Sequence, residues 1–304
     1  MSNATSMSVC VVGLGSMGMG AAQSCIKAGL RTWGVDLNPQ ALQTLRDSGA
    51  QAADTRADSF ATELDAVLLL VVNAAQVKQI LFAEQGLATR LRPGTAVMVS
   101  STISSQDALQ IEQRLAEYQL VMLDAPVSGG EAKAALGEMT VMASGSEHAF
   151  DLLQPVLDAV AGKVYRIGSK IGLGSTVKII HQLLAGVHIA VGAEAMALAA
   201  RAGIPLDTMY DVVTHAAGNS WMFENRMRHV VDGDYSPTSA VDIFVKDLGL
   251  VADTAKALHF PLPLASTAFN MFTSASNAGY GREDDSAVIK IFSGITLPAK
   301  QERE

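Results

Sequence analysis

Cysteine, positive charge and long apolar runs are all scarce in this sequence of 304 residues, and each scarcity excludes a class of protein. Two cysteines, Cys10 and Cys25, cannot supply the disulfide framework of a small secreted domain, so we expect both to be buried, reduced thiols. A formal net charge of −8 argues against nucleic acid or an anionic membrane as a partner, because both attract basic surfaces.

The longest wholly apolar run, residues 66–72, is too short to cross a bilayer, and the Ala-rich stretch 183–200 is interrupted by a histidine and a glutamate. Residues 1–8 lack the basic-then-apolar order of a signal peptide. The six histidines are scattered, and no His or Cys pair stands at ligand spacing beside a carboxylate cluster, so we predict no metal site. We expect a soluble, cytoplasmic protein that binds neither nucleic acid nor membrane.

Up to about residue 170, short aliphatic runs alternate with helical patterns. The predicted strands are 9–12, 31–35, 66–72, 96–99, 121–123 and 164–167, and the predicted helices between them are 16–28, 39–48, 104–117 and 147–160. Near-continuous apolar strands separated by helices are typical of a parallel sheet that is covered on both faces. The first part of the chain is therefore predicted to be α/β, with a mostly parallel, doubly wound sheet.

After residue 170, Ala, Leu and Met recur at helical spacing and strand patterns disappear. We expect one long interdomain helix over 172–202, followed by helices at 206–217, 219–231, 241–258 and 262–278. The sequence thus predicts two domains, a sheet domain at residues 1–170 and an all-α domain at 171–304.

A glycine-rich turn between the first predicted strand and helix matches the G-x-G-x-x-G pattern, in the order Gly13, Leu14, Gly15, Ser16, Met17 and Gly18. In a Rossmann domain these glycines allow a tight turn, close approach of a pyrophosphate and packing of helix on strand. Asp36 ends the second predicted strand, where its carboxylate would accept hydrogen bonds from ribose hydroxyls and repel the 2′-phosphate of NADP. We therefore predict NAD as the cofactor, although Arg31 and Arg56 leave some NADP use open. The alternative is an ordinary turn, with Asp36 capping the next helix.

Five ordered motifs resemble the 3-hydroxyisobutyrate (β-hydroxyacid) dehydrogenase family over nearly the whole chain. They are the glycine turn, Ser101-Thr102, the DAPVSGG stretch at 124–130, Gly174 with Lys178, and Lys246-Asp247-Leu248. The resemblance implies a Rossmann domain, a helical domain, and metal-free oxidation of a hydroxyl on a small carboxylic acid. It also implies a homodimer or homotetramer formed through the helical domain.

One position departs from the family pattern, because the common Lys-x-x-Asn is here Lys178-Ile179-Ile180-His181. In this the chain is most similar to the L-threonate dehydrogenases of the family, which implies oxidation of L-threonate to 2-dehydro-L-erythronate. The alternatives are 3-hydroxyisobutyrate dehydrogenase, 2-hydroxy-3-oxopropionate (tartronate semialdehyde) reductase, and, in another class, a non-catalytic NAD-binding sensor. Imine-reducing relatives typically replace the lysine.

Two predicted loops at the carboxyl edge of the sheet should face one crevice. We assign Asn73 and Thr102, which follow predicted strands, to the cofactor, and Ser128, Gly129 and Gly130 to the substrate carboxylate. Glycine backbone N–H groups can form an anion-binding concavity, although Ser and Gly also make ordinary turns.

Lys178 is the predicted general base. Its apolar neighbours favour a neutral amine that takes the hydroxyl proton, although an isolated lysine is more often a snorkelling surface residue. His181, one helical turn later, would bind substrate or orient Lys178, or would be a core histidine. By resemblance, Lys246 contacts the cofactor and Asp247 holds it, unless the two form a solvated pair. Pocket-lining or capping roles are open for Asn219, Ser220 and Asn225.

Overall fold

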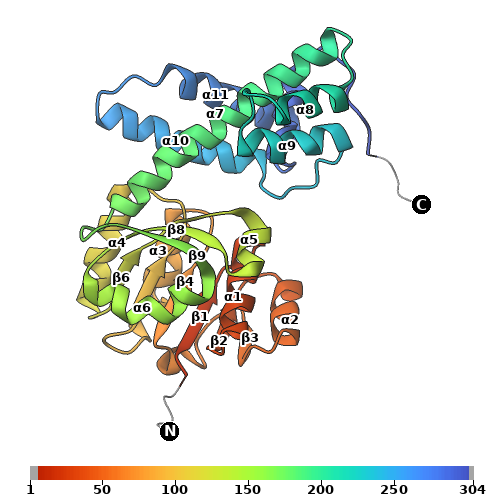
Figure 1. Ribbon diagram of the computed structural model, residues 1–304. Coiled ribbons are helices and arrows are strands. Elements are labelled where there is room, and N and C mark those ends of the chain that lie inside the picture. The colour runs from red at the N-terminus through yellow and green to blue at the C-terminus, as the bar shows by residue number, and fades with distance from the viewer. Residues whose placement is uncertain (1–5, 301–304) are drawn as a thin grey trace. The chain divides into compact units, whose positions relative to one another are not determined.

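The computed structural model describes residues 6–300 and divides the chain into two compact units, which meet in sequence between Lys178 and Ile179. Unit 1 holds the sheet, and unit 2 is built from helices (Figure 1).

Unit 1 contains a nine-stranded sheet in which six neighbouring strands are parallel, in the order β3-β2-β1-β4-β5-β6. β8 then pairs antiparallel with β6 and β7 and parallel with β9. The strands are β1 Ser8–Val12, β2 Arg31–Val35, β3 Ala52–Asp54, β4 Ala66–Leu69, β5 Ala96–Val99, β6 Val121–Asp124, β7 Val127–Ser128, β8 Met139–Ser144 and β9 Ala161–Gly168. This arrangement confirms the predicted mostly parallel, doubly wound sheet.

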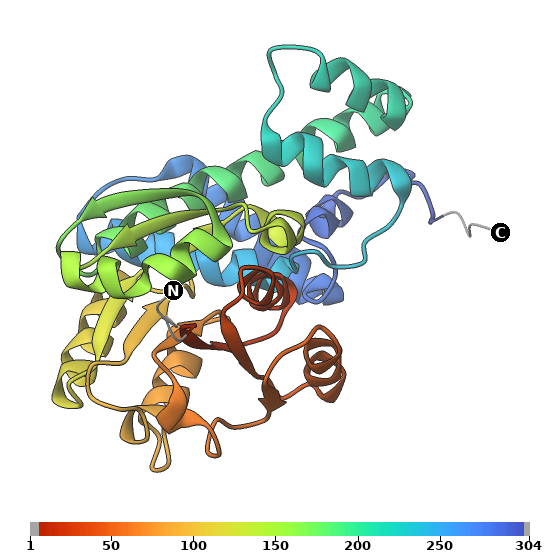
Figure 2. The ribbon, with the colours of Figure 1, turned by 60° about the horizontal axis from the view of Figure 1, so that its bottom comes forward.

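Helices cover both faces of this sheet (Figures 1 and 2). They are α1 Ser16–Lys27, α2 Pro39–Asp47, α3 Ala74–Phe82, α4 Ser105–Glu117, α5 Gly130–Leu136 and α6 Glu147–Val160. Polar side chains fix where four of them begin: the side chains of Asn38, Asn73, Ser104 and Ser146 accept hydrogen bonds from the first turns of α2, α3, α4 and α6.

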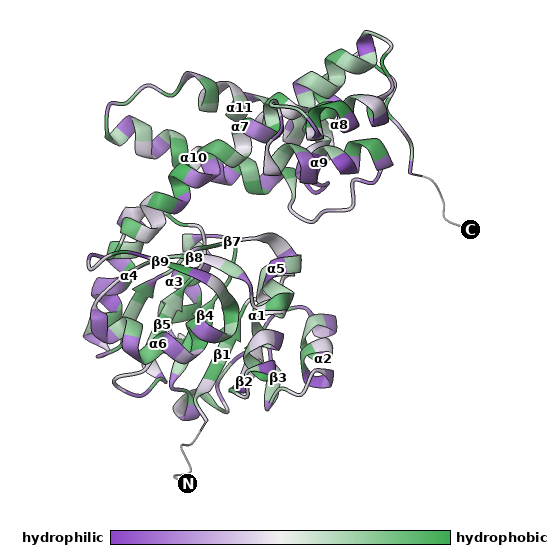
Figure 3. Ribbon diagram, in the orientation of Figure 1, coloured by the Kyte–Doolittle hydropathy of each residue, from purple (hydrophilic) through white to green (hydrophobic). Residues whose placement is uncertain are grey.

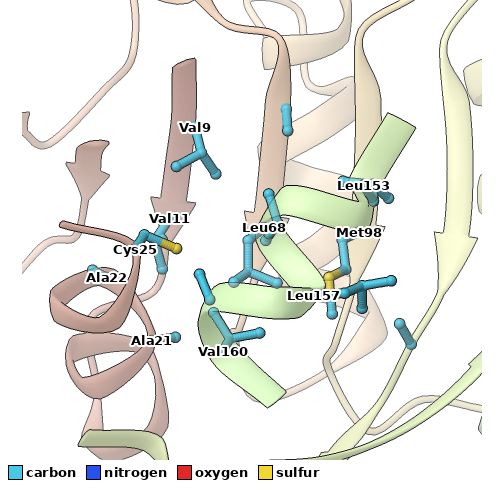
Figure 4. Packing of buried hydrophobic residues seen from close by; sticks show 14 of the residues in the cluster. Val9, Val11, Ala21, Ala22, Cys25, Leu68, Met98, Leu153, Leu157 and Val160 are labelled. Atoms are coloured by element: carbon cyan, nitrogen blue, oxygen red, sulfur yellow. The ribbon is translucent and has the colours of Figure 1, made fainter. Parts of the chain in front are cut away.

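Successive residues of each strand point to opposite faces of the sheet and belong to two separate hydrophobic cores. Val9, Val11, Leu68 and Met98 pack against α1 and α6 on one face, as Figure 4 shows. Their strand neighbours pack with α3 and α4 on the other face. Because both faces are apolar, the strands are continuously hydrophobic, and Figure 3 shows β1, β4 and β5 in green.

The two cysteines lie on opposite faces of the sheet. Cys10 belongs to the core beneath α3 and α4, and Cys25 belongs to the core formed with α1 and α6. Both are free, fully buried thiols, as predicted.

The regular elements in the described residues of unit 2 are helices, which are joined by loops. Its elements are the greater part of α7 Leu173–Arg201, then α8 Leu206–Thr214, α9 Trp221–Asp232, α10 Val241–Ala257, α11 Pro263–Ala275, a π-helical turn η3 Ser276–Tyr280 and a 3-10 helix η4 Asp285–Ile291. Their apolar faces form one core, in which Phe244 of α10 stacks on Phe272 of α11 with ring centroids 5.1 Å apart.

Helix α7 is the one helix among residues 6–300 that is long and apolar enough to cross a membrane by length and composition. Half of its most apolar window is buried inside the protein, as in the core helix of a soluble protein. Ile189, Ala193 and Met196 on this helix are buried in the core of unit 2.

Candidate active site

The glycine turn between β1 and α1 contains glycines that serve different purposes. Gly13 has a φ of +90°, and a Cβ there would lie 2.8 Å from the carbonyl oxygen of Leu70. A Cβ on Gly18 would lie 1.7 Å from the carbonyl oxygen of Gly13, so both positions are required for the fold itself. A Cβ on Gly15 would meet no atom of the described chain within 4 Å. Gly15 therefore borders open space of the kind that a pyrophosphate needs.

The N-terminus of α1 has the other property of a phosphate site. Gly15 is its N-cap residue, and no side chain in the part of the chain that the structure describes caps this helix. The first N–H groups of the helix therefore lack the side-chain acceptor that α2, α3, α4 and α6 have. The residues present thus fit a dinucleotide.

Asp36, directly after β2, is connected to this turn. Its carboxylate accepts hydrogen bonds from the backbone N–H of Leu14 at 2.6 Å and from that of Asn38 at 2.8 Å. The cap of α2 is Asn38, whose side chain accepts from Gln40 N–H. The side chain of Asp36 therefore lies beside the glycine turn and is not the cap of the following helix.

The loops after β4 and β5 lie on the same edge of the sheet, because β4 pairs with β1 and β5 with β4 in parallel register. The side chain of Asn73 caps α3 by accepting a hydrogen bond from Gln76 N–H at 2.9 Å. This residue therefore has a structural role in starting the helix. Thr102 is half-buried. Beside it, the buried hydroxyl of Ser101 has no hydrogen-bond partner within residues 6–300.

The Ser128-Gly129-Gly130 segment is a junction between strand and helix rather than a free turn, because β7 ends at Ser128 and α5 begins at Gly130. Gly129 and Gly130 have φ of +132° and +71°, which explains why both are glycine. The Ser100 hydroxyl donates to the carbonyl of Ala125 at 2.8 Å and so ties the end of β5 to the chain that leads into this segment.

A buried clamp that the sequence analysis missed holds the start of α7. Asp124, at the end of β6, accepts hydrogen bonds from the backbone N–H groups of Gly172 and Ser175, both at 2.9 Å. It also accepts from the hydroxyls of Ser175 at 2.6 Å and Ser144 at 3.2 Å. The Ser144 hydroxyl accepts in turn from Gly174 N–H at 2.9 Å. Burial raises the pKa of the Asp124 carboxyl, and the hydrogen bonds from Ser175, Gly172 and Ser144 act in the opposite direction.

Lys178 lies in the second turn of the helix that this clamp anchors, five residues after α7 begins at Leu173. Only 6% of the residue is exposed, which excludes the interpretation as a snorkelling surface lysine. Gly174 is needed for the same packing, because a Cβ there would lie 2.5 Å from the carbonyl oxygen of Met142 and 2.7 Å from that of Asp124.

In unit 2, four polar side chains from α7 and α10 form a continuous chain of contacts. Nδ1 of His181 lies 3.0 Å from Oε1 of Gln182, and Nε2 of Gln182 donates to Oδ2 of Asp247 at 2.5 Å. Oδ1 of Asp247 lies 2.6 Å from Nζ of Lys246. Asp247 is only 2% exposed, so the pair with Lys246 is not a solvated surface pair. Gln182, also buried, is the member that sequence patterns did not indicate.

Three further residues proposed for the pocket make local contacts. Ser220 caps α9 by accepting from Phe223 N–H at 3.0 Å, so the capping interpretation is right for this residue. The side-chain amide of Asn219 donates to Glu224, and the side-chain oxygen of Asn225 accepts from Arg226.

In the described portion of the chain, no group of three or more His, Cys, Asp or Glu side chains could hold a metal ion.

Comparisons with known proteins agree with this geometry. Residues 8–168 match the family model of the NAD binding domain of 6-phosphogluconate dehydrogenase, and residues 172–292 match that of the NAD-binding domain of NADP-dependent 3-hydroxyisobutyrate dehydrogenase. The chain is 78% identical over 302 residues to L-threonate dehydrogenase of Pectobacterium atrosepticum, covering 99% of both chains. It is 73% identical to that of Haemophilus influenzae, covering 96% of this chain and 97% of the other.

A solved structure is similar as well. The crystal structure of a 3-hydroxyisobutyrate dehydrogenase from Salmonella typhimurium has a TM-score of 0.92 and 74% sequence identity, covering 94% of this chain and all of that one.

Proposed function

Because the chain belongs to the 3-hydroxyisobutyrate dehydrogenase family of NAD-dependent oxidoreductases, we propose that it oxidises L-threonate to 2-dehydro-L-erythronate. The relatives named L-threonate dehydrogenase, which are 73–78% identical over almost their whole length, support this substrate. The structural observation that carries the mechanism is the buried Lys178 on a helix whose first turn is clamped to the sheet.

In the proposed reaction Lys178 is the general base. Its Nζ takes the proton from the hydroxyl on C2 of the substrate. NAD, when held at the glycine turn, would supply the acceptor for the hydride from the same carbon. The products are the 2-oxo acid, NADH and one proton, so atoms and electrons balance. In the reverse direction the Lys178 ammonium protonates the carbonyl oxygen.

We assign the cofactor to the glycine turn, Asp36, Asn73, Thr102 and Lys246. The open space at Gly15 and the uncapped N-terminus of α1 support a pyrophosphate there. The position of the Asp36 carboxylate beside Leu14 supports a role in ribose binding. The assignment of Lys246 to the cofactor is supported by the resemblance of its motif to the family and by no contact in the structure.

We assign the substrate carboxylate to Ser128, Gly129 and Gly130, whose left-handed glycine backbone suits an anion-binding concavity. His181 is proposed to bind another polar group of the substrate, since it replaces the asparagine that the family commonly carries. In this proposal residues 1–170 supply the NAD-binding domain, and residues 171–304 supply the substrate and oligomerisation domain.

A purified-protein assay tests the reaction. L-threonate should reduce NAD, and Lys178→Met should lower kcat by about a thousandfold or more, consistent with loss of a general base. The solved relative named 3-hydroxyisobutyrate dehydrogenase makes that hydroxy acid the second candidate, and tartronate semialdehyde should be tested in the reductive direction. Higher kcat/KM on either of these than on L-threonate would overturn the substrate assignment, and full turnover by Lys178→Met would overturn the mechanism.

A matched glycine pair tests the cofactor site. Gly15→Ala should fold normally and bind NAD weakly, because its added methyl enters open space that the pyrophosphate requires. Gly18→Ala should instead lose stability, because its methyl would overlap the carbonyl of Gly13. Circular dichroism and NAD titration of both variants separate the two effects, and normal NAD affinity in Gly15→Ala would contradict the assignment.

We further propose a cytoplasmic homodimer or homotetramer. Leu184, Val191 and Leu198 are spaced seven residues apart on α7 and are each more than half exposed, so they form an apolar stripe along one side of the helix. Light scattering of the wild-type protein should show an oligomer, and Leu184→Glu combined with Leu198→Glu should reduce the mass to that of a smaller species. An unchanged mass in the double variant would exclude the stripe as an interface.

A further inference from the structure

The chain of contacts from Lys246 to His181 has a direction, which is set at the buried Asp247. Asp247 forms an ion pair with the Lys246 ammonium, whose Nζ lies 2.6 Å from Oδ1, and a carboxylate can only accept hydrogen bonds. The Gln182 amide must therefore present Nε2, its donor atom, to Oδ2 of Asp247, as the 2.5 Å contact has it. The orientation of this amide follows from the charge next to it.

Once the amide is oriented, its carbonyl oxygen faces the imidazole. Oε1 of Gln182 lies 3.0 Å from Nδ1 of His181, and a carbonyl oxygen has no hydrogen to give. Nδ1 of His181 must then carry the hydrogen of this bond. In the neutral imidazole the other nitrogen, Nε2, carries the lone pair and accepts.

We propose that Gln182 is a positioning residue that fixes the Nδ1–H tautomer of His181, so that Nε2 accepts a hydrogen bond from a substrate hydroxyl. The selected ligand chemistry is an acid with a hydroxyl besides the one that is oxidised. A lone pair at Nε2 can accept a hydrogen bond from an O–H group, whereas a methyl group or a carbonyl oxygen in that place cannot donate one. Where L-threonate is concerned, this inference rests on the proposed function, and the hydroxyl on the third or fourth carbon would supply the donor.

The tautomer can be measured without any substrate. In protein labelled with 15N-histidine, two-bond proton–nitrogen correlations distinguish a nitrogen that carries a hydrogen from one that carries a lone pair. His181→Asn identifies the His181 signals among those of the six histidines. At a pH at which the imidazole is neutral, the hydrogen should be on Nδ1. A hydrogen on Nε2 would overturn the proposal, whatever the enzyme oxidises.

Variants test whether Gln182 causes this preference. Gln182→Met keeps the length of the side chain and removes the hydrogen bonds to His181 and Asp247, so the tautomers should become mixed. The double variant Gln182→Glu with Asp247→Asn restores a donor facing an acceptor along the chain, so the Nδ1–H form should return. Gln154→Met is a matched control, because Gln154 also donates to an aspartate, Asp158, on the exposed surface of α6. An unchanged tautomer in Gln182→Met would refute the role of Gln182.

Kinetics at saturating NAD give the functional readout. The wild-type enzyme should prefer L-threonate over its 3-deoxy or 4-deoxy analogue by about tenfold to a hundredfold in kcat/KM, as expected when an analogue lacks a hydroxyl that the site binds through a hydrogen bond. Gln182→Met should narrow this ratio, while Gln154→Met should not. An equal ratio in wild type and Gln182→Met would count against the inference. Failure of the wild-type enzyme to oxidise L-threonate would count only against the proposed function, since the tautomer measurement stands separately.

Discussion

Asp124 links the end of β6 to the first turn of α7, and its removal should loosen the helix that carries Lys178. Asp124→Ala leaves two backbone N–H groups, those of Gly172 and Ser175, without their acceptor in a buried place. Each buried donor left unpaired costs about 1–3 kcal/mol, which gives about 2–6 kcal/mol for the two. The burial that raises the pKa of Asp124 also makes its charge costly, so part of this loss is offset, and we expect about 2–4 kcal/mol.

Hydrogen exchange is the suitable assay, because it reports on one segment of a chain with two units. The amides of 172–176 should exchange about 30-fold to 1000-fold faster in Asp124→Ala, which is the equivalent of about 2–4 kcal/mol if local opening limits exchange. kcat should fall more than the KM for NAD rises, because the change disturbs the placement of Lys178 and leaves the glycine turn intact.

Asp65 provides the control. It also lies at a strand end and accepts one backbone N–H, that of Ser8 at 2.9 Å, but its side chain is 47% exposed. Asp65→Ala should cost about 1 kcal/mol and leave exchange at 172–176 unchanged. If the amides of 172–176 exchange as slowly in Asp124→Ala as in the wild type, the buried carboxylate does not hold the helix.

Three other expectations concern separate parts of the protein. Burial raises the pKa of Asp285 to about 7 against the pull of Arg226, whose Nε lies 2.7 Å away. A raised pKa in the folded state means that stability is greatest below the pKa of the unfolded chain and is lost as the pH rises from about 4 to about 7. The melting temperature of the wild type minus that of Asp285→Asn should therefore fall as the pH rises over this range. The variant also leaves Arg226 without its charged partner, which shifts this difference by the same amount at every pH. A difference that does not change with pH would contradict the raised pKa of Asp285. Burial also raises the pKa of Cys25 to about 12 and that of Cys10 further, so a thiol reagent should modify both only after unfolding, and fast labelling of the native protein would show that the core opens. Asp36→Ala should narrow the preference for NAD over NADP by about tenfold in kcat/KM, since one charge-assisted hydrogen bond is worth about 1.5–3 kcal/mol; unchanged ratios would exclude ribose recognition by this carboxylate.

The long, strongly patterned elements could be predicted from the sequence. Strands β1, β2, β5 and β6 and helices α1, α2, α4 and α6 are found within a residue or two of their expected bounds, because apolar runs and polar caps are local signals. The expected strand 66–72 is shorter, since β4 ends at Leu69 and the chain then turns along the glycine loop.

The elements that the sequence did not predict have local sequence signals that are weak or misleading. β3 and β7 are three and two residues long, and their pairing with neighbours defines them more than their composition does. α5 begins at a double glycine, which in isolation indicates a turn. β8, Met139–Ser144, contains residues that suit a helix as well as a strand, so its antiparallel pairing was not foreseen.

The candidate site shows the same division. Lys178 and the glycine turn stand out through their motifs, whereas the roles of Asp124 and Gln182 depend on partners far away in the sequence. Asp124 meets Ser175 across 51 positions and Gln182 meets Asp247 across 65, and no local pattern records such contacts.

The glycine turn also offers a way to interpret diverging copies of this protein. A larger residue at Gly18 would clash with the backbone of the chain itself, so selection would remove it even in a copy that no longer carries out any reaction. A substitution at Gly15 leaves the bare chain undisturbed. A copy that keeps Gly13 and Gly18 but has a larger residue in place of Gly15 should therefore be a stable protein that no longer binds the nucleotide, free to acquire a different use for the same scaffold.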